Sequence, residues 1–464
     1  MVVAQTFDLN VEKVLEHWTP AHALREVIAN ALDEHALLGR SDRPAVEKDE
    51  AGVWHVRDHG RGLRYHHLTQ NESDEKRASD VVVGQFGVGL KDALATFHRN
   101  GIGVRISSPH GTITLAEQSK HGFDDVVTLH AVVGAPVEIT GTDVALARIT
   151  DADVVEAMGF FLVFDESVAV LETTSFGQVL ARSGDSPPSV YVRGVRVAED
   201  DGLLFSYNVT KVDAKLRRAL NRERSNVGRS AYTDRIKAVL LAVEEQAVLT
   251  GLVEDMAGFV KGATHDEVKW NDVAERVVRE LAAVDPNVVF VTAAQRWSHP
   301  ELIRRAEVDG KRVFVVPDAL AARLRISDDG AVTTLERFAA QWNERVVIEP
   351  LDPTVLSPAE QAVFELAGEV LKVLGRRGDE WQVVVSETLH LTPDGTETAH
   401  GLWDPAQRRI VINRRCLRST DLFVATLLHE VAHAITGATD LTAEFEDGLT
   451  DLLGTVGVRA VTPT

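Results

Sequence analysis

Residues Arg25–Asp33 read Arg-Glu-Val-Ile-Ala-Asn-Ala-Leu-Asp, and this stretch decides how the first part of the chain is interpreted. On a helix Glu26, Asn30 and Asp33 share one face, because they follow one another at intervals of four and three residues. The residues between them are apolar. Three polar groups on one face form either a solvated surface or a polar site, and this stretch by itself leaves both interpretations open.

Three further motifs follow in the next 120 positions or so. Val56–Gly62 (VRDHGRG) reads as a strand that ends in an aspartate, followed by two glycines that let a flat ligand approach the backbone. Gly84–Gly89 (GQFGVG) is a glycine loop that opens a helix, so its N–H groups suit phosphates. Ile139–Val144 (ITGTDV) begins a strand.

In this order and spacing the four motifs resemble the nucleotide pocket of the GHKL superfamily of gyrase, heat-shock chaperones, histidine kinases and MutL. The resemblance covers about residues 1–150 and implies a Bergerat-type ATPase sandwich that binds ATP and Mg²⁺. It implies that Glu26 activates the attacking water as general base and that Asn30 holds Mg²⁺. Asp33 is expected to orient the pocket rather than to contact nucleotide.

The same resemblance implies how adenine is recognised. Asp58 would accept a hydrogen bond from the adenine amino group, and Thr142 would support it through water. Gly60 and Gly62 would leave room for the base.

The glycine loop resembles that of the heat-shock chaperones almost letter for letter. By this resemblance Gly84, Gly87 and Gly89 let a lid close over the phosphates, with Lys91 nearby as a charge partner. The sequence departs from the chaperones at Leu90-Lys91, where they have an aromatic pair, and this puts the packing of the lid in doubt.

A basic stretch, Lys215–Arg229, lies in the region that follows the pocket. It is interpreted as a solvated helix face, as a nucleic-acid contact, or as part of a transducer-like domain. Leu220–Ser225 (LNRERS) resembles the chaperone loop that extends a cation to the γ-phosphate. Arg222 and Arg224 are the candidates, and an arginine there would stabilise transition-state charge and report the nucleotide state.

Near the other end, Thr426–Ile435 contains the pattern H-E-x-x-H. On a helix His429 and His433 face the same point and can share one metal ion, while Glu430 lies next to water bound there. A core pair of satisfied histidines is the alternative. The apolar surroundings favour the metal, because two buried histidines and a glutamate need a polar partner.

This segment resembles the zincin metallopeptidases. The resemblance implies that His429 and His433 bind zinc, that Glu430 is the general base, and that the strand Arg409–Asn413 pairs with extended substrate. The helix is expected to end at Gly437, a C-capping glycine. A second helix, Thr442–Leu453, should then fold back.

The third zinc ligand is open among four acidic residues. Glu446 ranks first because it lies about two turns into the returning helix, level with the histidines. Asp440 resembles the metzincin ligand but lies one residue too far along the chain. Asp447 fits the register of thermolysin-type enzymes, and Glu444 is the last candidate.

The predicted architecture is α+β and multidomain. It comprises a GHKL ATP-binding domain (1–150), a transducer-like α/β domain (151–248), a small α/β spacer or docking domain (249–350) and a zincin-like α+β domain (351–464). Glu349–Pro358 is punctuated by prolines and marks the last boundary. The small domain carries no recognisable chemistry.

Composition restricts the partners. The 464 residues are 44% hydrophobic with a formal net charge of −21, which suits a globular protein and disfavours nucleic acid or anionic membrane as a partner. No apolar run approaches the roughly 20 residues of a membrane span. The single cysteine, Cys416, and a start without an apolar leader predict a cytoplasmic protein.

We therefore expect an ATPase whose nucleotide state regulates a zinc-dependent peptidase acting on protein or peptide. By resemblance to GHKL proteins it should form a nucleotide-dependent homodimer. Such a fusion suits a switch in a bacterial stress or phage-defence pathway. One alternative is a chaperone-like or signalling ATPase with a non-proteolytic zinc domain. The other is a nucleic-acid-associated ATPase resembling MutL or MORC proteins.

Overall fold

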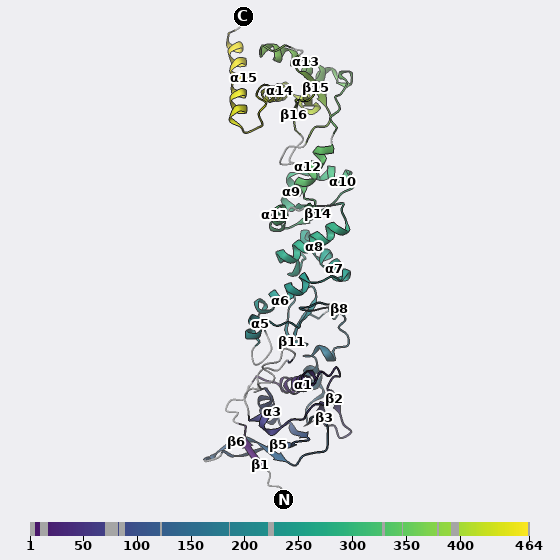
Figure 1. Ribbon diagram of the computed structural model, residues 1–464, viewed down its shortest axis with the longest axis vertical. Coiled ribbons are helices and arrows are strands. Elements are labelled where there is room, and N and C mark those ends of the chain that lie inside the picture. The colour runs from purple at the N-terminus through teal and green to yellow at the C-terminus, as the bar shows by residue number, and fades with distance from the viewer. Residues whose placement is uncertain are drawn as a thin grey trace. The chain divides into compact units, whose positions relative to one another are not determined.

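The computed structural model shown in Figure 1 describes residues 5–9, 17–69, 82, 89–120, 123–184, 186–220, 227–326, 330–345, 347–377, 380–390 and 399–462. The chain divides into two compact units, Met1–Asp255 with Thr264–Arg276 and Met256–Ala263 with Val277–Thr464. Each unit contains helices and more than one sheet, so the α+β multidomain class is confirmed. The division into four domains stays a prediction.

The first unit contains a seven-stranded antiparallel sheet in its described residues. In spatial order its strands are β1 (Gln5–Asp8), β6 (Phe123–Gly134), β5 (Gly111–Lys120), β4 (Gly103–Ser108), β7 (Asp143–Ala147), β3 (Trp54–Arg57) and β2 (Ala45–Lys48). The expected hairpin at Pro109-His110 is confirmed as β4 and β5. The edge strands β1 and β2 have four residues each, which is too short for alternating hydrophobicity to predict them from the sequence.

Helices α1 (Pro20–Leu37), α3 (Gly89–Arg99) and α4 (Asp151–Met158) pack together with this sheet around one apolar core. Helix α1 begins at Pro20 because Thr19 caps it, its side chain accepting a hydrogen bond from the His22 N–H. Residues 11–16, which precede this helix, lie outside the described residues.

A second, five-stranded sheet follows in the same unit. Its strands, in spatial order, are β11 (Val195–Glu199), β10 (Ser189–Val192), β12 (Ser206–Val209), β9 (Gly177–Leu180) and β8 (Val170–Thr173). Strand β10 ends at Val192, because Arg193 and Gly194 have φ of 50° and 80° and turn the chain back into β11. Two consecutive positive φ values match the right-handed twist of a hairpin.

Three helices accompany the second sheet, and a later segment returns to it. The helices are α5 (Ala214–Ala219), α6 (Arg229–Leu241) and α7 (Gln246–Ala257). In the returning segment Glu267 is fully buried, and its Oε1 accepts hydrogen bonds from the Leu204 N–H and the Tyr207 hydroxyl, both 2.8 Å long. These bonds join residues 264–276 to the first unit.

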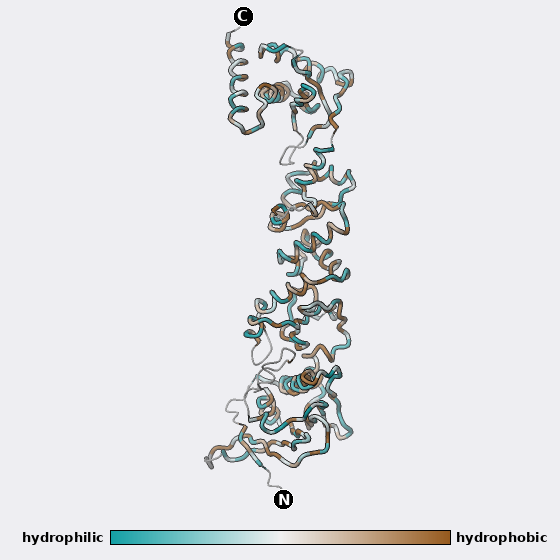
Figure 2. The backbone as a smooth tube through the Cα atoms, in the orientation of Figure 1, coloured by the Kyte–Doolittle hydropathy of each residue, from teal (hydrophilic) through white to brown (hydrophobic). Residues whose placement is uncertain are grey.

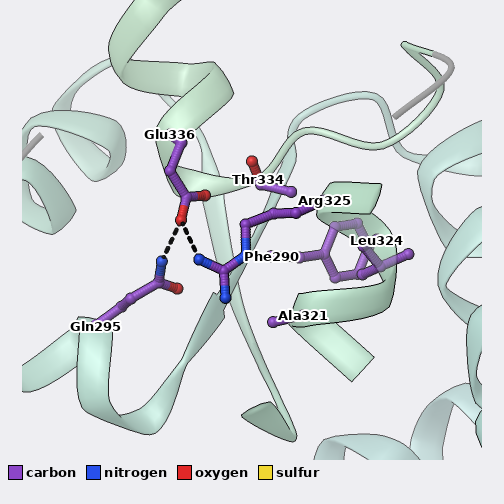
Figure 3. Close-up of a pocket in the computed structure, with 7 residues that line it drawn as sticks. All are labelled: Phe290, Gln295, Ala321, Leu324, Arg325, Thr334 and Glu336. Carbon is purple, nitrogen blue, oxygen red and sulfur yellow. Dashed lines mark hydrogen bonds and ion pairs between the residues drawn. The ribbon is translucent and has the colours of Figure 1, made fainter. Parts of the chain in front are cut away.

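The small α/β part contains two strands and several helices in its described residues. Strands β13 (Val288–Thr292) and β14 (Arg312–Val316) pair in parallel. The helices around them are α8 (Asn271–Val284), α9 (Ala293–Ser298), α10 (Pro300–Val308), α11 (Asp318–Ile326) and α12 (Leu335–Arg345). Figure 3 shows a hollow here in which Glu336 accepts hydrogen bonds from Gln295 (2.9 Å) and Arg325 (3.2 Å). These groups satisfy one another, as structural packing requires.

The last part is a three-stranded sheet with three helices. Strand β17 (Arg409–Asn413) lies between β15 (Gln382–Ser386), which is parallel to it, and β16 (Gly401–Asp404), which is antiparallel. The helices are α13 (Pro358–Val373), α14 (Thr420–Thr436) and α15 (Ala443–Val461). Helix α14 is apolar over most of its length (Figure 2) and ends at Gly437, as predicted, with φ of 66°.

Membrane insertion has no support in the helices. Among the parts of the chain that the structure describes, no helix combines the length and apolar character needed to cross a lipid bilayer.

Candidate functional site

Helix α1 carries the first group of predicted site residues. Glu26 and Asp33 are almost completely buried, and Asn30 is half-buried. The interpretation of this face as a solvated surface is therefore wrong, because two of its three polar groups are inside the protein. Buried carboxylates need polar partners.

Glu26 has two neighbours that the sequence did not indicate. Its Oε1 accepts hydrogen bonds from Nη2 and Nε of Arg25, at 3.1 and 3.2 Å. Arg25 is fully buried, and its guanidinium lies over the Trp18 ring, 5.7 Å from the ring centre. A Cβ at Gly89 would lie 2.4 Å from Glu26 Oε2, so only glycine lets α3 begin so close to this carboxylate.

The structure describes some of the other predicted site residues on α1 and around the glycine loop. The Asn30 side chain donates a hydrogen bond from Nδ2 to the Glu26 carbonyl oxygen, 2.8 Å away, which fixes the orientation of its amide. Lys91 is buried in the first turn of α3. Gly84 and Gly87 lie outside the described residues.

Asp58 and Thr142 meet, although 83 residues separate them in the chain. Strand β3 pairs with β7, and directly beyond the pair the Asp58 N–H donates to the Thr142 carbonyl oxygen (3.0 Å). Asp58 Oδ1 in turn accepts from the N–H groups of Thr142 (3.1 Å) and Gly60 (2.8 Å). Burial raises the pKa of Asp58 above its ordinary value, and these hydrogen bonds oppose the rise.

The loop after Asp58 is held against α1. Glu34 accepts hydrogen bonds from the backbone N–H and the guanidinium of Arg61, each 2.8 to 3.0 Å long. A Cβ at Gly60 would lie 2.1 Å from Glu34 Cγ, and Gly62 has φ of 86°. Both glycines are therefore required for the path of this loop, whatever ligand it binds.

Gly141 is a third glycine on which the Asp58 site depends. It has φ of 78°, and an added Cβ would lie 2.0 Å from the Asp58 carbonyl oxygen. We expect Gly141→Ala to lower the free energy of unfolding by about 2–4 kcal/mol, because strain and collision add. Urea unfolding measures the loss.

Gly101→Ala is the matched control. Gly101 also has a positive φ, 68°, but nothing lies within 4 Å of a Cβ there. Gly101→Ala should lower the free energy of unfolding by only about 1 kcal/mol, because backbone strain alone acts there. Equal losses at the two positions would show that the contact with Asp58 is unimportant.

The predicted γ-phosphate arginines, Arg222 and Arg224, lie outside the described residues. Two basic residues at the ends of the same stretch are paired with acids. Lys215 lies 2.8 Å from Asp234, and Arg229 forms short hydrogen bonds with Asp200 and Asp266. These pairs reduce the positive charge that the stretch offers to nucleic acid.

The second candidate site is on α14, where three donor atoms meet. His429 Nε2 and His433 Nε2 are 3.2 Å apart. Asp440 Oδ1 lies 3.1 Å from the first and 3.3 Å from the second. His433 Nδ1 lies 2.8 Å from the Ala438 carbonyl oxygen and donates to it, so Nε2 keeps its lone pair for another partner.

These distances fit a zinc ion. Bonds of 2.0–2.1 Å at tetrahedral angles place ligand atoms about 3.3 Å apart, which agrees with the 3.1 to 3.3 Å observed here. Burial lowers the pKa of His429, which favours the neutral ring that a metal ligand requires. Two histidines and a carboxylate also form a common catalytic zinc set with an open fourth position.

The structure brings a different acid to the histidines than the one ranked first, and the third ligand itself stays a prediction. Asp440, the second choice, joins the histidines in the metal-binding group found among the described residues. Glu446, the first choice, is exposed and outside that group, because Phe445 faces the histidines instead, stacked 4.4 Å from the His433 ring. The next residue on a helix is rotated by about 100°. Glu444 and Asp447 are also exposed.

Two substitutions test whether Asp440 or Glu446 is the third zinc ligand. Asp440→Ala should lower zinc affinity by about 100-fold or more, because one of three protein ligands is lost. Glu446→Ala should leave it unchanged. Competition with a chromophoric chelator measures both affinities. Full zinc retention by Asp440→Ala, or loss of zinc in Glu446→Ala, would reverse the assignment.

Glu430 is buried beside the donor atoms. Burial, and then the charge of Asp440, raise the pKa of its carboxyl to about 8. A Cβ at Gly401 would lie 2.6 Å from Glu430 Oε1, so β16 passes directly over the glutamate. This close approach requires glycine at position 401, a requirement that the sequence did not signal.

The expected role of Arg409–Asn413 as the strand that pairs with substrate was wrong. This strand is β17, and both of its edges are occupied, by β15 and by β16. A strand with two neighbours has no N–H and C=O row left for a further strand. Strand β16 is one of the two edge strands of this sheet, and its Gly401 lies next to Glu430.

Comparison with known proteins gives one family and two relatives. The family model described as Mycoplasma pneumoniae MPN635 N-terminal domain matches residues 152–246, which include the second sheet. One uncharacterized protein of Mycoplasma pneumoniae is 34% identical over 238 residues, which are 50% of this chain and 95% of the relative. Another from the same strain is 23% identical over 335 residues, 68% of this chain and 94% of the relative.

Proposed function

The chain belongs to the family of the Mycoplasma pneumoniae protein that is 34% identical to it, and for this member we propose an ATPase whose nucleotide state regulates a zinc-dependent peptidase. The observation that carries the proposal is the meeting of His429, His433 and Asp440 beside the buried Glu430. A histidine pair that only stabilised the core would not need a third donor and an adjacent buried acid.

The peptidase chemistry follows from the residues around the donor atoms. A bound zinc ion supplies Lewis acidity and lowers the pKa of water to about 7. Glu430, in its ionised form, would take the proton from the attacking water and transfer it to the amine that leaves. Ala438 holds the His433 ring through Nδ1. Among the described residues β16 pairs with no strand other than β17, so its outer edge can pair with an extended peptide.

The ATPase half of the proposal rests on two contacts that bring predicted motifs together. Asp58 bonds to Thr142, and Glu26 lies against Gly89 at the start of α3. Asp58 would accept from the adenine amino group, and Gly60 would keep the floor of the pocket open. Asp33 would orient the helix face from its buried position.

The phosphate end of the pocket completes this half. Glu26 would take the proton of the attacking water, with Asn30 as the Mg²⁺ ligand and Lys91 near the phosphates. Gly84 and Gly87 would form the lid with Gly89, and Arg222 or Arg224 would contact the γ-phosphate. A nucleotide-dependent homodimer and a protein or peptide substrate belong to the same proposal.

One experiment tests both halves. A denatured mixed proteome is incubated with the protein, with and without ATP, and new termini are identified by mass spectrometry. Glu26→Ala and Glu430→Ala proteins are run beside the wild type. Cleavage that needs ATP and Glu430 supports a coupled enzyme. Cleavage without ATP leaves two independent activities. ATP hydrolysis without any cleavage supports the chaperone-like alternative.

A further inference from the structure

Phe160 occupies a position between the two sheets of the first unit. It follows α4 by two residues and is partly buried. Two guanidinium groups lie near its ring, Arg25 Cζ at 5.4 Å and Arg196 Cζ at 5.5 Å from the ring centre. The His22 ring is a third neighbour, with the two ring centroids 5.5 Å apart. Contacts at these distances are attractive cation–π interactions.

The backbone at Phe160 is fixed to the second sheet. The Arg196 N–H donates to the Phe160 carbonyl oxygen, and the Leu162 N–H donates to the Gly194 carbonyl oxygen, both at 2.8 Å. Phe161 and Val195 form an antiparallel bridge between these bonds. The segment therefore adds a short strand to the β11 edge, and its position depends on that of the second sheet.

The same hairpin also contacts the chain just before the glycine loop. Arg193, in the turn between β10 and β11, donates from Nη1 to the carbonyl oxygen of Val82, 2.7 Å away. Val82 is fully buried. This hairpin of the second sheet thus contacts Val82, two positions before the glycine loop, and, through Phe160, helix α1.

On helix α1 Phe160 contacts Arg25, which donates hydrogen bonds to Glu26. Arg25 has no exposed surface, so its charge must be balanced inside the protein. Glu26 balances it at 3.1 Å, and the rings of Trp18 and Phe160 lie against the guanidinium. Arg196 has its own carboxylate, Glu199 at 2.7 Å. Since the Glu26 carboxylate is held by Arg25, the orientation of the carboxylate depends on what holds Arg25.

We propose that Phe160 is a positioning residue for Glu26, and that it transmits the position of β11 to this carboxylate through Arg25. The inference rests on the proposed ATPase function, in which Glu26 must lie within hydrogen-bonding reach of the attacking water. A shift of the second sheet moves Phe160 through its backbone bonds. The shift changes the rate of the chemical step and leaves the adenine contacts at Asp58 unchanged.

The test compares two phenylalanines of one segment. Phe160→Leu removes the aromatic face and keeps an apolar side chain. Phe164→Leu is the matched control. Phe164 is also partly buried, but the guanidinium near its ring is that of Arg43, 5.8 Å from the ring centre. Steady-state kinetics give kcat and KM for ATP, calorimetry gives the Kd of ATP, and thermal melting reports stability.

We expect Phe160→Leu to lower kcat about tenfold with an unchanged Kd for ATP, since a small misplacement of a reacting group slows chemistry without weakening remote contacts. Phe160→Tyr should keep the wild-type kcat, and so should Phe164→Leu. Arg25→Lys keeps the charge without the planar group and should show the same selective loss of kcat. In that background Phe160→Leu should lower kcat no further.

The inference is overturned if wild-type protein hydrolyses ATP and Phe160→Leu does so at the same rate, or if Phe164→Leu loses as much kcat. Additive losses in the Arg25→Lys background would also overturn it. Absence of ATP binding and hydrolysis in the wild type would instead remove the proposed function, and the inference with it. If Phe160→Leu does not fold, the Arg25→Lys and Phe160→Tyr proteins decide the outcome.

Discussion

Glu430→Gln should abolish peptide cleavage while zinc remains bound. Glutamine has nearly the shape of glutamate and fits the same buried place, but it cannot accept a proton from water. We expect the rate to fall by about 10²–10⁴, the usual contribution of a general base. A quenched-fluorescence peptide library measures cleavage, and metal analysis of the dialysed protein measures zinc.

Two further variants test whether the loss of cleavage is specific to Glu430. Glu369→Gln removes an exposed acid that pairs with Lys372 on α13, and it should cleave at the wild-type rate. Gly401→Ala should lower cleavage without changing any reacting group, because its Cβ needs the space of Glu430 Oε1, 2.6 Å away. Cleavage by Glu430→Gln at more than a tenth of the wild-type rate would exclude Glu430 as the base.

Glu26→Gln should abolish ATP hydrolysis and also destabilise the protein. The first effect follows from loss of the proposed base, about 10²–10⁴ in kcat. The second follows from Arg25, which is fully buried and would lose the negative charge of Glu26, 3.1 Å away. Breaking a buried ion pair in this way costs about 3–5 kcal/mol. A coupled ATPase assay and urea unfolding measure the two effects separately.

A double variant distinguishes the two causes. Arg25→Met with Glu26→Gln removes both charges, so much of the lost stability should return, since apolar replacement of a buried ion pair is often neutral. Hydrolysis should stay absent. ATP should still raise the melting temperature of the double variant, because a ligand that binds the folded state stabilises it. Recovery of hydrolysis together with stability would mean that Glu26 acts only as the partner of Arg25.

The local features of both candidate sites were predictable from the sequence. Helical spacing places His429 and His433 on one face, and the structure confirms that their Nε2 atoms meet. Gly437 ends the helix as expected, and Pro20 begins α1. These features depend on residues within one or two turns of each other, where helix geometry and capping decide the outcome.

The neighbours of Glu26 and the pairing of Asp58 with Thr142 required the folded chain. Nothing in Arg25–Asp33 indicates that Arg25 is buried between aromatic rings from other segments. The contact between Asp58 and Thr142 follows from the antiparallel pairing of β3 with β7. Strand order is set by packing over the whole sheet, so a motif predicts its own strand and not its neighbours.

What the sequence by itself determined is the chemistry offered at each site: two histidines with a glutamate on one helix, and an aspartate followed by glycines after a strand. The tertiary structure decided which further groups join them. Asp440 joins the donor group because the chain turns at Gly437, with φ of 66°, between the histidines and Asp440. The rotation of α15 points Phe445 inward and Glu446 outward. A turn and a helix rotation depend on long-range packing, which local spacing does not specify.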